Sequence, residues 1–187
     1  MGPQGAGKGT QAKNIAEQYG VPHLATGDLY RAHKAAGSEL GKLVAPLLDA
    51  GKLVPDEITI PIVRSEIEQA TEGFVLDGYP RNIAQAEALD AMLEEIERPL
   101  SIVLLLELDD EVARERMRKR AETEGRADDT PEAIERRLAT YHEQTEPVVE
   151  RYRASGKLVP IQAERTIDQV TGEIVEALEV LDEEAIA

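Results

Sequence analysis

The sequence has no cysteine and no tryptophan, and aromatic residues make up only 3% of the chain. The absence of cysteine excludes disulfide bonds, catalysis by a thiolate and a zinc site held by cysteine. It also fits a reducing compartment, so we expect a cytoplasmic location. Because aromatic rings are so few, platforms for stacking nucleic-acid bases are scarce.

Long apolar runs and an excess of positive charge are also missing. The longest apolar run, Ile102 to Leu106, has the length of a strand, so we expect no membrane span. The formal net charge of −16 argues against nucleic-acid polymers and anionic membranes as partners, although a mononucleotide remains compatible with it. With 187 residues, of which 42% are hydrophobic and 31% charged, the chain suits one soluble α/β domain.

The stretch from Gly2 to Thr10, which reads GPQGAGKGT, has the spacing of a phosphate-binding loop. Glycines allow such a backbone to curl with its N–H groups pointing inward, in conformations that side chains disfavour. Lys8 adds a positive charge for the β- and γ-phosphates, and the helix expected from Lys8 to Tyr19 begins at an anion site. The alternative is a glycine-rich turn that only caps a helix.

Two features of this loop depart from the general pattern. Gly9 stands where a Ser or Thr usually follows the lysine, and Thr10 offers a hydroxyl one position later, for a phosphate or Mg²⁺. A phosphate loop also normally follows a buried strand, whereas only Met1 precedes Gly2. We therefore expect the chain to be less stable than one with about five to seven apolar residues before Gly2, unless another segment fills the position of that strand.

Strand and helix patterns alternate along the chain, which predicts an α/β fold with a parallel sheet. Phe74–Leu76 and Ser101–Leu108 are the clearest strands, and the second is apolar enough to be buried on both faces. Asn82 and Gln85 form a capping box for the helix after the first strand. Thr130 and Pro131 begin a long helix that Pro147 is expected to kink or split.

Asp77 follows an apolar strand, at the sheet edge where open α/β sheets bind ligands. An acid there is the expected partner of the Mg²⁺ at a phosphate loop, directly or through water. The alternative is a turn or helix-capping aspartate.

Eight of the 21 lysines and arginines lie between Arg114 and Arg137. Arg116 and Arg120 share one helix face, Arg126 lies in a glycine loop and Arg137 follows on the next helix. In an acidic protein this cluster indicates a clamp for phosphates, and the alternative is a solvated helix face paired with glutamates. A phosphate loop, Mg²⁺ and closing arginines are the parts that phosphoryl transfer requires.

Four motifs, in order and spacing, together resemble the adenylate kinase family. They are GPQGAGKGTQ at residues 2–11, ATGDLYR at 25–31, DGYPR at 77–81 and GRADD at 125–129, and the resemblance covers nearly the whole chain. It implies a three-layer P-loop fold with a central parallel sheet, a helical AMP-binding lobe and the short form of the lid, without the inserted β-domain that sometimes carries zinc. The division implied within the single domain is a core of residues 1–24, 55–118 and 130–187, a nucleotide-binding lobe of 25–54 and a lid of 119–129.

The resemblance implies that the chain transfers a phosphoryl group from MgATP to AMP and yields two ADP, as a monomer. Catalysis would rest on Lys8, Arg81, Arg120, Arg126 and Arg137. Residues implied at ATP are Gly5, Ala6, Gly7, Lys8, Gly9, Thr10, Arg116 and the main chain of Arg165. Residues implied at AMP are Thr26, Arg31, Lys52, Leu53, Val54, Gly78, Tyr79, Pro80, Arg81, Gln85, Arg126 and Arg137.

The same resemblance implies that Asp77 holds Mg²⁺ through water, with Thr10 as a second candidate, and that Asp128 and Asp129 steady the lid arginines. Pyrimidine-specific relatives tend to have Ala at the position of Thr26 and to replace the glutamine at Gln85, so both residues favour AMP over UMP or CMP. Two alternatives stay open at this point: a UMP or CMP kinase, and a shortened, non-catalytic member of the family.

Overall fold

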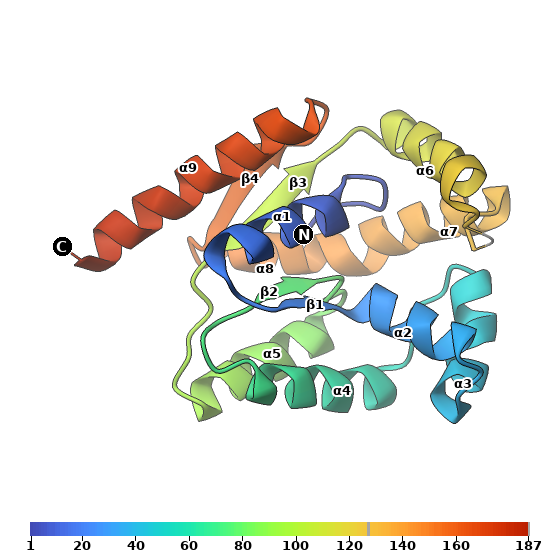
Figure 1. Ribbon diagram of the computed structural model, residues 1–187, viewed down its shortest axis with the longest axis horizontal. Coiled ribbons are helices and arrows are strands. Elements are labelled where there is room, and N and C mark those ends of the chain that lie inside the picture. Colours follow the sequence, from blue (N-terminus) through green and yellow to red (C-terminus); the bar gives the residue numbers. More distant parts are fainter. Residues whose placement is uncertain (127, 187) are drawn as a thin grey trace.

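The computed structural model describes residues 1–126 and 128–186, with side chains as far as residue 181. It is rich in helix, and its strands pair in parallel (Figure 1). The strands are β1 (His23–Ala25), β2 (Val75–Asp77), β3 (Val103–Glu107) and β4 (Leu158–Gln162). The helices are α1 (Lys8–Tyr19), α2 (Thr26–Ala35), α3 (Glu39–Asp49), α4 (Asp56–Gln69), α5 (Ile83–Glu95), α6 (Asp110–Glu124), α7 (Pro131–Thr140), α8 (Glu146–Ala154) and α9 (Ile167–Ile186).

Local sequence signals account for several of these boundaries. Gly7 and Gly20, both left-handed, flank α1 at the residues expected for its start and end. The Asn82 side chain accepts a hydrogen bond from the Gln85 N–H and so caps α5, as the sequence predicts. Thr130 does the same for α7 through the Ala133 N–H, and Pro131 occupies the first helical position.

The helix predicted to run from Thr130 past Pro147 is divided before the proline. A five-residue π-helical turn, η1 (Tyr141–Thr145), separates α7 from α8, and Pro147 lies in the first turn of α8. Proline has no N–H to donate, so the main-chain hydrogen-bonding pattern must change around it. The predicted break is therefore confirmed, and it begins a few residues earlier than the proline itself.

The parallel strands form two separate pairs. β1 pairs with β2, placing His23 opposite Val75, and β3 pairs with β4, placing Val103 opposite Leu158. Among the residues that the structure describes, no ladder joins β2 to β3. The single central sheet expected from the sequence is thus present as two halves.

Separate apolar clusters cover these halves. Leu24 of β1 belongs to a cluster with Val63 and Ile67 of α4 and Leu89 of α5. Ile161 of β4 belongs to another with side chains from α1 and α9. In Figure 1, α4 and α5 lie below the β1–β2 pair, α9 lies above the β3–β4 pair, and α1 crosses in front of the space between them.

The region expected to form a nucleotide-binding lobe consists of α2 and α3, which pack tightly against each other. A Cβ on Gly41 would come within 2.0 Å of the His33 carbonyl oxygen, so a side chain there would force the two helices apart. Tyr30, Val44 and Val54 form the buried centre of this region. The pair projects from the rest of the molecule below α7 (Figure 1).

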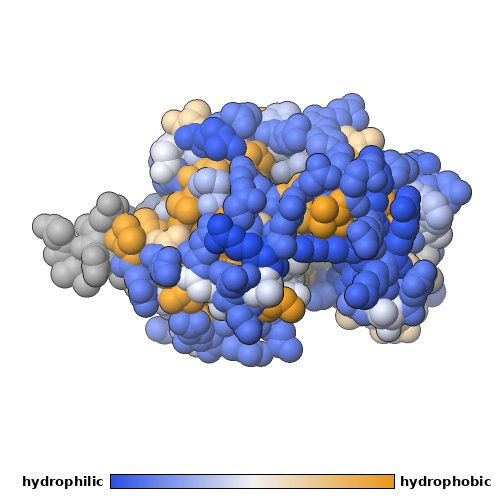
Figure 2. All heavy atoms as spheres, turned by 90° about the horizontal axis from the view of Figure 1, so that it is seen from above, coloured by the Kyte–Doolittle hydropathy of each residue, from blue (hydrophilic) through white to orange (hydrophobic). Residues whose placement is uncertain are grey.

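The surface seen from above is mostly hydrophilic, with scattered hydrophobic patches (Figure 2). Across residues 1–126 and 128–186, none of the helices combines the length and the apolar character that a membrane span requires.

Candidate active site

A cavity of about 1030 Å³ opens between the phosphate loop, α2, α6 and α7. The cavity lies beside the carboxyl ends of β1 and β2. Its wall includes Ala25 and Asp77, which are the last residues of those two strands. Ligands of open α/β sheets bind at this edge. The predicted site residues that line the cavity are Gly5, Gly7, Lys8, Gly9, Thr10, Thr26, Arg31, Lys52, Leu53, Val54, Asp77, Gly78, Arg81, Gln85, Arg116, Arg120, Arg126 and Arg137.

Four predicted site residues do not line this cavity. Ala6 is buried, and Tyr79 is turned inward, where its hydroxyl donates to the Gln85 carbonyl. Pro80 follows Tyr79 and is also buried. The Arg165 side chain is half exposed and forms an ion pair with Glu173 of α9, while its neighbour Ile167 lines the cavity.

The phosphate loop has the conformation that its glycines predict. Gly5 and Gly7 have φ values of 87° and 86°, which L side chains rarely adopt. At Gly5 a Cβ would also come within 2.9 Å of the Ala113 carbonyl oxygen in α6. The loop therefore needs glycine at position 5 both for its curvature and for its close approach to α6.

Lys8 is held inside the loop. Its ammonium group donates to the carbonyl oxygens of Gly2 and Pro3, at 2.8 and 2.7 Å. Burial lowers the pKa of Lys8 to about 8, although the nearby carboxylate of Asp77 opposes this shift. A buried ammonium with only carbonyl partners is strongly disposed to bind an anion.

Asp77 faces the loop from the end of β2. Its Oδ2 lies 3.6 Å from Nε2 of His23. Burial alone would raise the Asp77 pKa, but His23 and the positive charges of Lys8 and Arg81 outweigh that effect and hold the pKa below its usual range. The carboxylate is therefore ionised at neutral pH, as an acid that attracts a cation must be.

His23 was not among the residues predicted at the site, and the structure places it there. Its Nε2 is buried, has no hydrogen-bond partner among the described residues, and lies against Asp77. The sequence offered no signal for this contact, because β1 and β2 come together only through tertiary pairing.

The predicted arginine clamp is brought together by two aspartates. Arg120 donates to both carboxylate oxygens of Asp129, at 2.8 and 3.0 Å, and Arg137 bonds to Asp129 as well. Arg137 also donates to Asp128 at 2.7 Å. The Asp129 side chain is fully buried, so these charge-assisted bonds are largely shielded from water.

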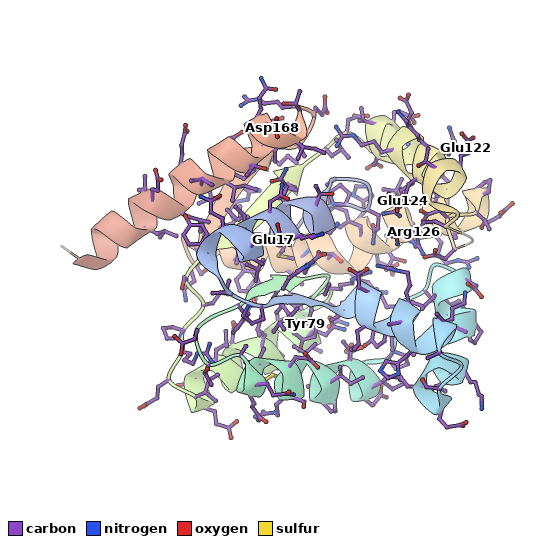
Figure 3. All side chains as sticks on the ribbon, in the orientation of Figure 1. Glu17, Tyr79, Glu122, Glu124, Arg126 and Asp168 are labelled. Atoms are coloured by element: carbon purple, nitrogen blue, oxygen red, sulfur yellow. The ribbon has the colours of Figure 1, made fainter. Side chains whose placement is uncertain are left out.

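Arg126 completes this group from the end of α6. Its Nε lies 3.3 Å from Glu124 Oε2, and Figure 3 shows the two side chains near the end of α6. Residue 127 of the predicted lid lies outside the described residues. By contrast, Arg114 pairs on the surface with Glu111 and Glu135, as the alternative of a solvated helix face predicts.

The opposite wall carries the residues predicted to select the acceptor. The Thr26 hydroxyl donates to the Gly78 carbonyl at 3.1 Å. Gln85 is buried, with its amide oxygen accepting from the Arg81 N–H at 2.8 Å and its amide nitrogen donating to Asp56 at 2.7 Å. Both ends of the amide thus have protein partners, and Asp56 was not among the residues predicted at the site.

Arg81 lies between the two walls. Its Nε donates to the Gly78 carbonyl at 2.7 Å, and burial lowers its pKa although Asp77 opposes the shift. Together with Lys8, Arg31, Arg120 and Arg137, it gives the cavity a concentration of positive charge within a protein of net charge −16. This arrangement can hold several phosphate groups and can stabilise charge that develops between them.

Among the side chains that the structure describes, in residues 1–126 and 128–181, no group of three or more His, Cys, Asp or Glu residues is placed to hold a metal ion. Asp77 is the ionised carboxylate nearest the loop, and its Oδ2 lies 3.5 Å from the position of a Cβ on Gly9. This position suits an ion that is carried mainly by phosphate oxygens and water.

Comparisons with known proteins agree with the geometry of this cavity. Residues 1–157 match the family described as adenylate kinase. The chain is 46% identical over 180 residues to "Adenylate kinase" of Stenotrophomonas maltophilia (strain R551-3), covering 95% of this chain and 96% of the relative. It is 48% identical over 178 residues to "Adenylate kinase" of Synechococcus sp. (strain RCC307), covering 95% and 96%. It is 47% identical over 181 residues to "Adenylate kinase" of Bifidobacterium longum (strain NCC 2705), covering 96% and 97%.

Proposed function

Because the chain belongs to the adenylate kinase family, we propose that it transfers the terminal phosphoryl group of MgATP to AMP and releases two ADP. A phosphate oxygen of AMP forms the new bond to the γ-phosphorus, and the bond to the β,γ-bridging oxygen breaks. The single observation that carries the proposal is one cavity lined by the phosphate loop, Asp77 and the arginines of the clamp. Such a site acts by positioning phosphates and neutralising their charge.

The donor nucleotide is assigned to the phosphate loop. The main chain from Gly5 to Thr10 would surround the β-phosphate, and Lys8 would move from its carbonyl partners to the transferred group. Arg116, which donates to the Ala163 carbonyl at 2.9 Å, would flank the base. The main chain of Arg165 would also lie near the base, since Ile167, two residues further on, lines the cavity.

The acceptor is assigned to the wall formed by Thr26, Arg31, Lys52 to Val54 and Gly78 to Arg81. Arg31 and Arg81 would bind its phosphate, and Thr26 and Gln85 would face its base. For Gln85 to hydrogen-bond to the base, its side-chain amide must give up its hydrogen bonds to Asp56 and to the Arg81 N–H and form new ones with the nucleotide. Tyr79 and Pro80 would support this wall from within.

Mg²⁺ is part of the donor substrate and neutralises phosphate charge when bound. We assign Asp77 to it through water, because the carboxylate is ionised and faces the loop. The Thr10 hydroxyl, which also lines the cavity, is the second candidate.

Arg120, Arg126 and Arg137 are assigned to the transferred phosphate. Asp128 and Asp129 keep two of these guanidinium groups on the cavity side, so less ordering remains to be done when nucleotides bind. Residues 119–129 would act as the lid and residues 25–54 as the acceptor lobe, with the remainder of the chain as the core.

A pyrimidine acceptor is the alternative that the sequence left open, and nothing in the comparisons favours it. The purified chain should be assayed for ADP formation with MgATP and AMP, UMP or CMP in turn. We expect kcat/KM with AMP to exceed the values with UMP and CMP by about a hundredfold or more. A site whose polar groups hydrogen-bond to the edge of adenine leaves some of those groups without a partner when a pyrimidine binds. Equal rates with UMP would reject the assignment of Thr26 and Gln85, and no activity with any acceptor would favour a non-catalytic member of the family.

We further propose that the protein works as a monomer in the cytoplasm. The monomer is implied by the family alone. The lack of cysteine supports the cytoplasm, and the strongly negative net charge disfavours nucleic-acid polymers and anionic membranes as partners. Light scattering at several concentrations tests the monomer, since a dimer would give twice the expected mass.

A further inference from the structure

The side-chain amide of Gln85, which lines the nucleotide cavity, is held between two groups of opposite hydrogen-bonding character. Its Oε1 accepts from the Arg81 N–H at 2.8 Å, and its Nε2 donates to Asp56 at 2.7 Å. A main-chain N–H can only donate, and a carboxylate can only accept. Turning the amide over would place two donors against each other at one end and two acceptors at the other, so the protein fixes which end is the donor.

A second amide fixes the position of the Asp56 carboxylate. The Gln85 main-chain N–H donates to Asn82 Oδ1 at 2.8 Å, so that Asn82 Nδ2 donates to the two oxygens of Asp56, at 3.1 and 3.2 Å. This chain of hydrogen bonds begins at the main-chain N–H of Gln85 and ends at that of Arg81. Because both ends can only donate, each amide between them has one favourable orientation, and Asp56 is the member that accepts from both sides.

Asp56 lies behind the wall of the cavity and does not line it. It is the first residue of α4, whereas Asn82 caps α5, which lies beside α4 below the β1–β2 pair (Figure 1). Gln85 is only 2% exposed, so water cannot readily replace either partner of its amide. The Tyr79 hydroxyl holds the main chain of the same residue, by donating to the Gln85 carbonyl at 3.0 Å. Asp56 therefore acts on a bound nucleotide through the Gln85 amide.

The orientation of this amide matters because the bases differ in the order of their donors and acceptors. On the pairing edge of adenine the N6 amino group, a donor, stands beside N1, an acceptor. Uracil has the reverse order, with the acceptor O4 beside the N3–H donor, and cytosine has the order of adenine. In the empty cavity Oε1 of Gln85 already faces a donor and Nε2 an acceptor. Adenine can thus replace both partners without the amide turning over, whereas uracil requires it to turn.

We propose that Asp56 is a specificity-determining residue, which holds the Gln85 amide in the orientation that suits adenine and opposes the one that suits uracil. This role rests on the proposed function, since Gln85 is there assigned to the base of the acceptor. It separates two kinds of discrimination. Uracil is rejected by the order of its donor and acceptor, which Asp56 controls, whereas cytosine is rejected by its smaller ring, on which Asp56 has no influence.

Asp56→Asn tests this role, because it keeps the shape of the side chain but offers one acceptor group where the carboxylate offers two. kcat/KM is measured with MgATP and AMP, UMP or CMP, and the dissociation constants of the three monophosphates are measured by calorimetric titration without ATP. We expect the preference for AMP over UMP to fall by about tenfold or more, and the preference for AMP over CMP to stay within about threefold of its original value. A loss of folded protein would lower all three rates alike, so the ratios report the orientation of the amide.

Glu57→Gln is the matched control for this variant. It removes a negative charge from the same first turn of α4, at an exposed residue that does not line the cavity. Both preferences should therefore stay unchanged. A second control uses a Gln85→Met chain, which has no amide to orient. In that chain Asp56→Asn should no longer alter the preference for AMP over UMP, because the two residues act as a coupled pair.

The results would distinguish the role of Asp56 from the reaction itself. A chain that binds AMP selectively but forms no ADP would reject the proposed transfer, and the ratios of dissociation constants would then decide the role of Asp56. Unchanged ratios in Asp56→Asn, an equal fall in both preferences, or the same change in the Gln85→Met chain would overturn the role of Asp56 while the kinase activity stands. A chain that binds none of the three nucleotides would overturn both.

Discussion

At the scale of single residues, Lys8 is the side chain on which the proposed reaction depends most. Its ammonium group is buried at the loop and is bonded only to carbonyl oxygens, so it can turn to a phosphate without breaking an ion pair. We expect Lys8→Met to lower kcat by about a hundredfold or more, because it removes a donor aimed at the charge that develops in transfer. Initial rates with saturating MgATP and AMP measure this loss.

Lys42→Met is the matched control for this variant. Lys42 is an exposed lysine on α3 that pairs with Glu39 and does not line the cavity. It should keep the rate of the unmodified chain. A Lys8→Met protein that retains most of its activity would show that the loop acts through its main chain alone.

Met1 predicts a dependence of stability on pH. Its pKa is about 5 in the folded chain, against 8.0 when exposed, because burial disfavours the charged form. Between pH 5 and pH 8 the unfolded chain therefore binds more protons than the folded one, and stability falls as the pH is lowered through this window. The contribution of this group is at most about 4 kcal/mol, since three pKa units correspond to that energy.

Acetylation of the Met1 amino group isolates this contribution, because it removes the charge and leaves other titrating groups in place. Unfolding in urea at pH 5 and pH 8 should show a smaller pH difference for the acetylated chain. If both forms lose stability equally between the two pH values, the amino terminus is not buried in solution.

At the scale of elements, Asp129 joins α6 to α7. It accepts hydrogen bonds from Arg120 of α6 and Arg137 of α7 while itself fully buried. Replacing it with alanine leaves two guanidinium groups without their shared partner, and we expect a loss of about 3 kcal/mol in the free energy of unfolding. Denaturant titration measures this loss.

Asp49→Ala provides the comparison for Asp129→Ala. Asp49 pairs with Lys34 at the surface, where it is half exposed. Exposed ion pairs contribute about 0–1 kcal/mol to the free energy of unfolding, so Asp49→Ala should change that free energy very little. Equal effects of the two substitutions would mean that Asp129 acts as an ordinary surface partner and does not hold the clamp.

The elements also show what the sequence can and cannot predict. Signals that act within a few residues gave the ends of α1, the cap of α5 and the start of α7, because glycine conformation and side-chain caps are local. The start of α2 at Thr26 and the π-helical turn before Pro147 were not predicted. At both places the chain packs against distant segments, and Thr145, in that turn, donates to the Arg81 carbonyl 64 positions away.

The same distinction applies to the site. The loop, Asp77, Arg31, Arg81 and Arg126 could be chosen from sequence because each belongs to a compact motif. Arg116, Arg120 and Arg137 could be chosen because they belong to one cluster of positive residues, and the structure brings both groups to the cavity. The contact of His23 with Asp77 and the bond of Gln85 to Asp56 could not, since they join residues 54 and 29 positions apart. Arg165 was implied by the resemblance through its main chain alone, and its side chain forms an ion pair with Glu173.

At the scale of the whole molecule, the division of the sheet leads to the last prediction. The sequence places only Met1 before the phosphate loop, and the structure has a cavity of about 520 Å³ and a buried ammonium group beside it. A chain with about five apolar residues in front of Met1 would fill the cavity, replace the ammonium by a peptide bond and pair both sheet edges. We expect it to melt about 10 °C above the unmodified chain, because several kcal/mol are gained and each shifts the melting temperature of a protein of this size by about 2–4 °C. An extension of equal length made of Gly and Ser removes the charge but cannot fill the cavity, so it should give only part of this rise. Equal melting temperatures for the unmodified and apolar-extended chains would mean that, in solution, the two strand pairs close on each other without an added strand.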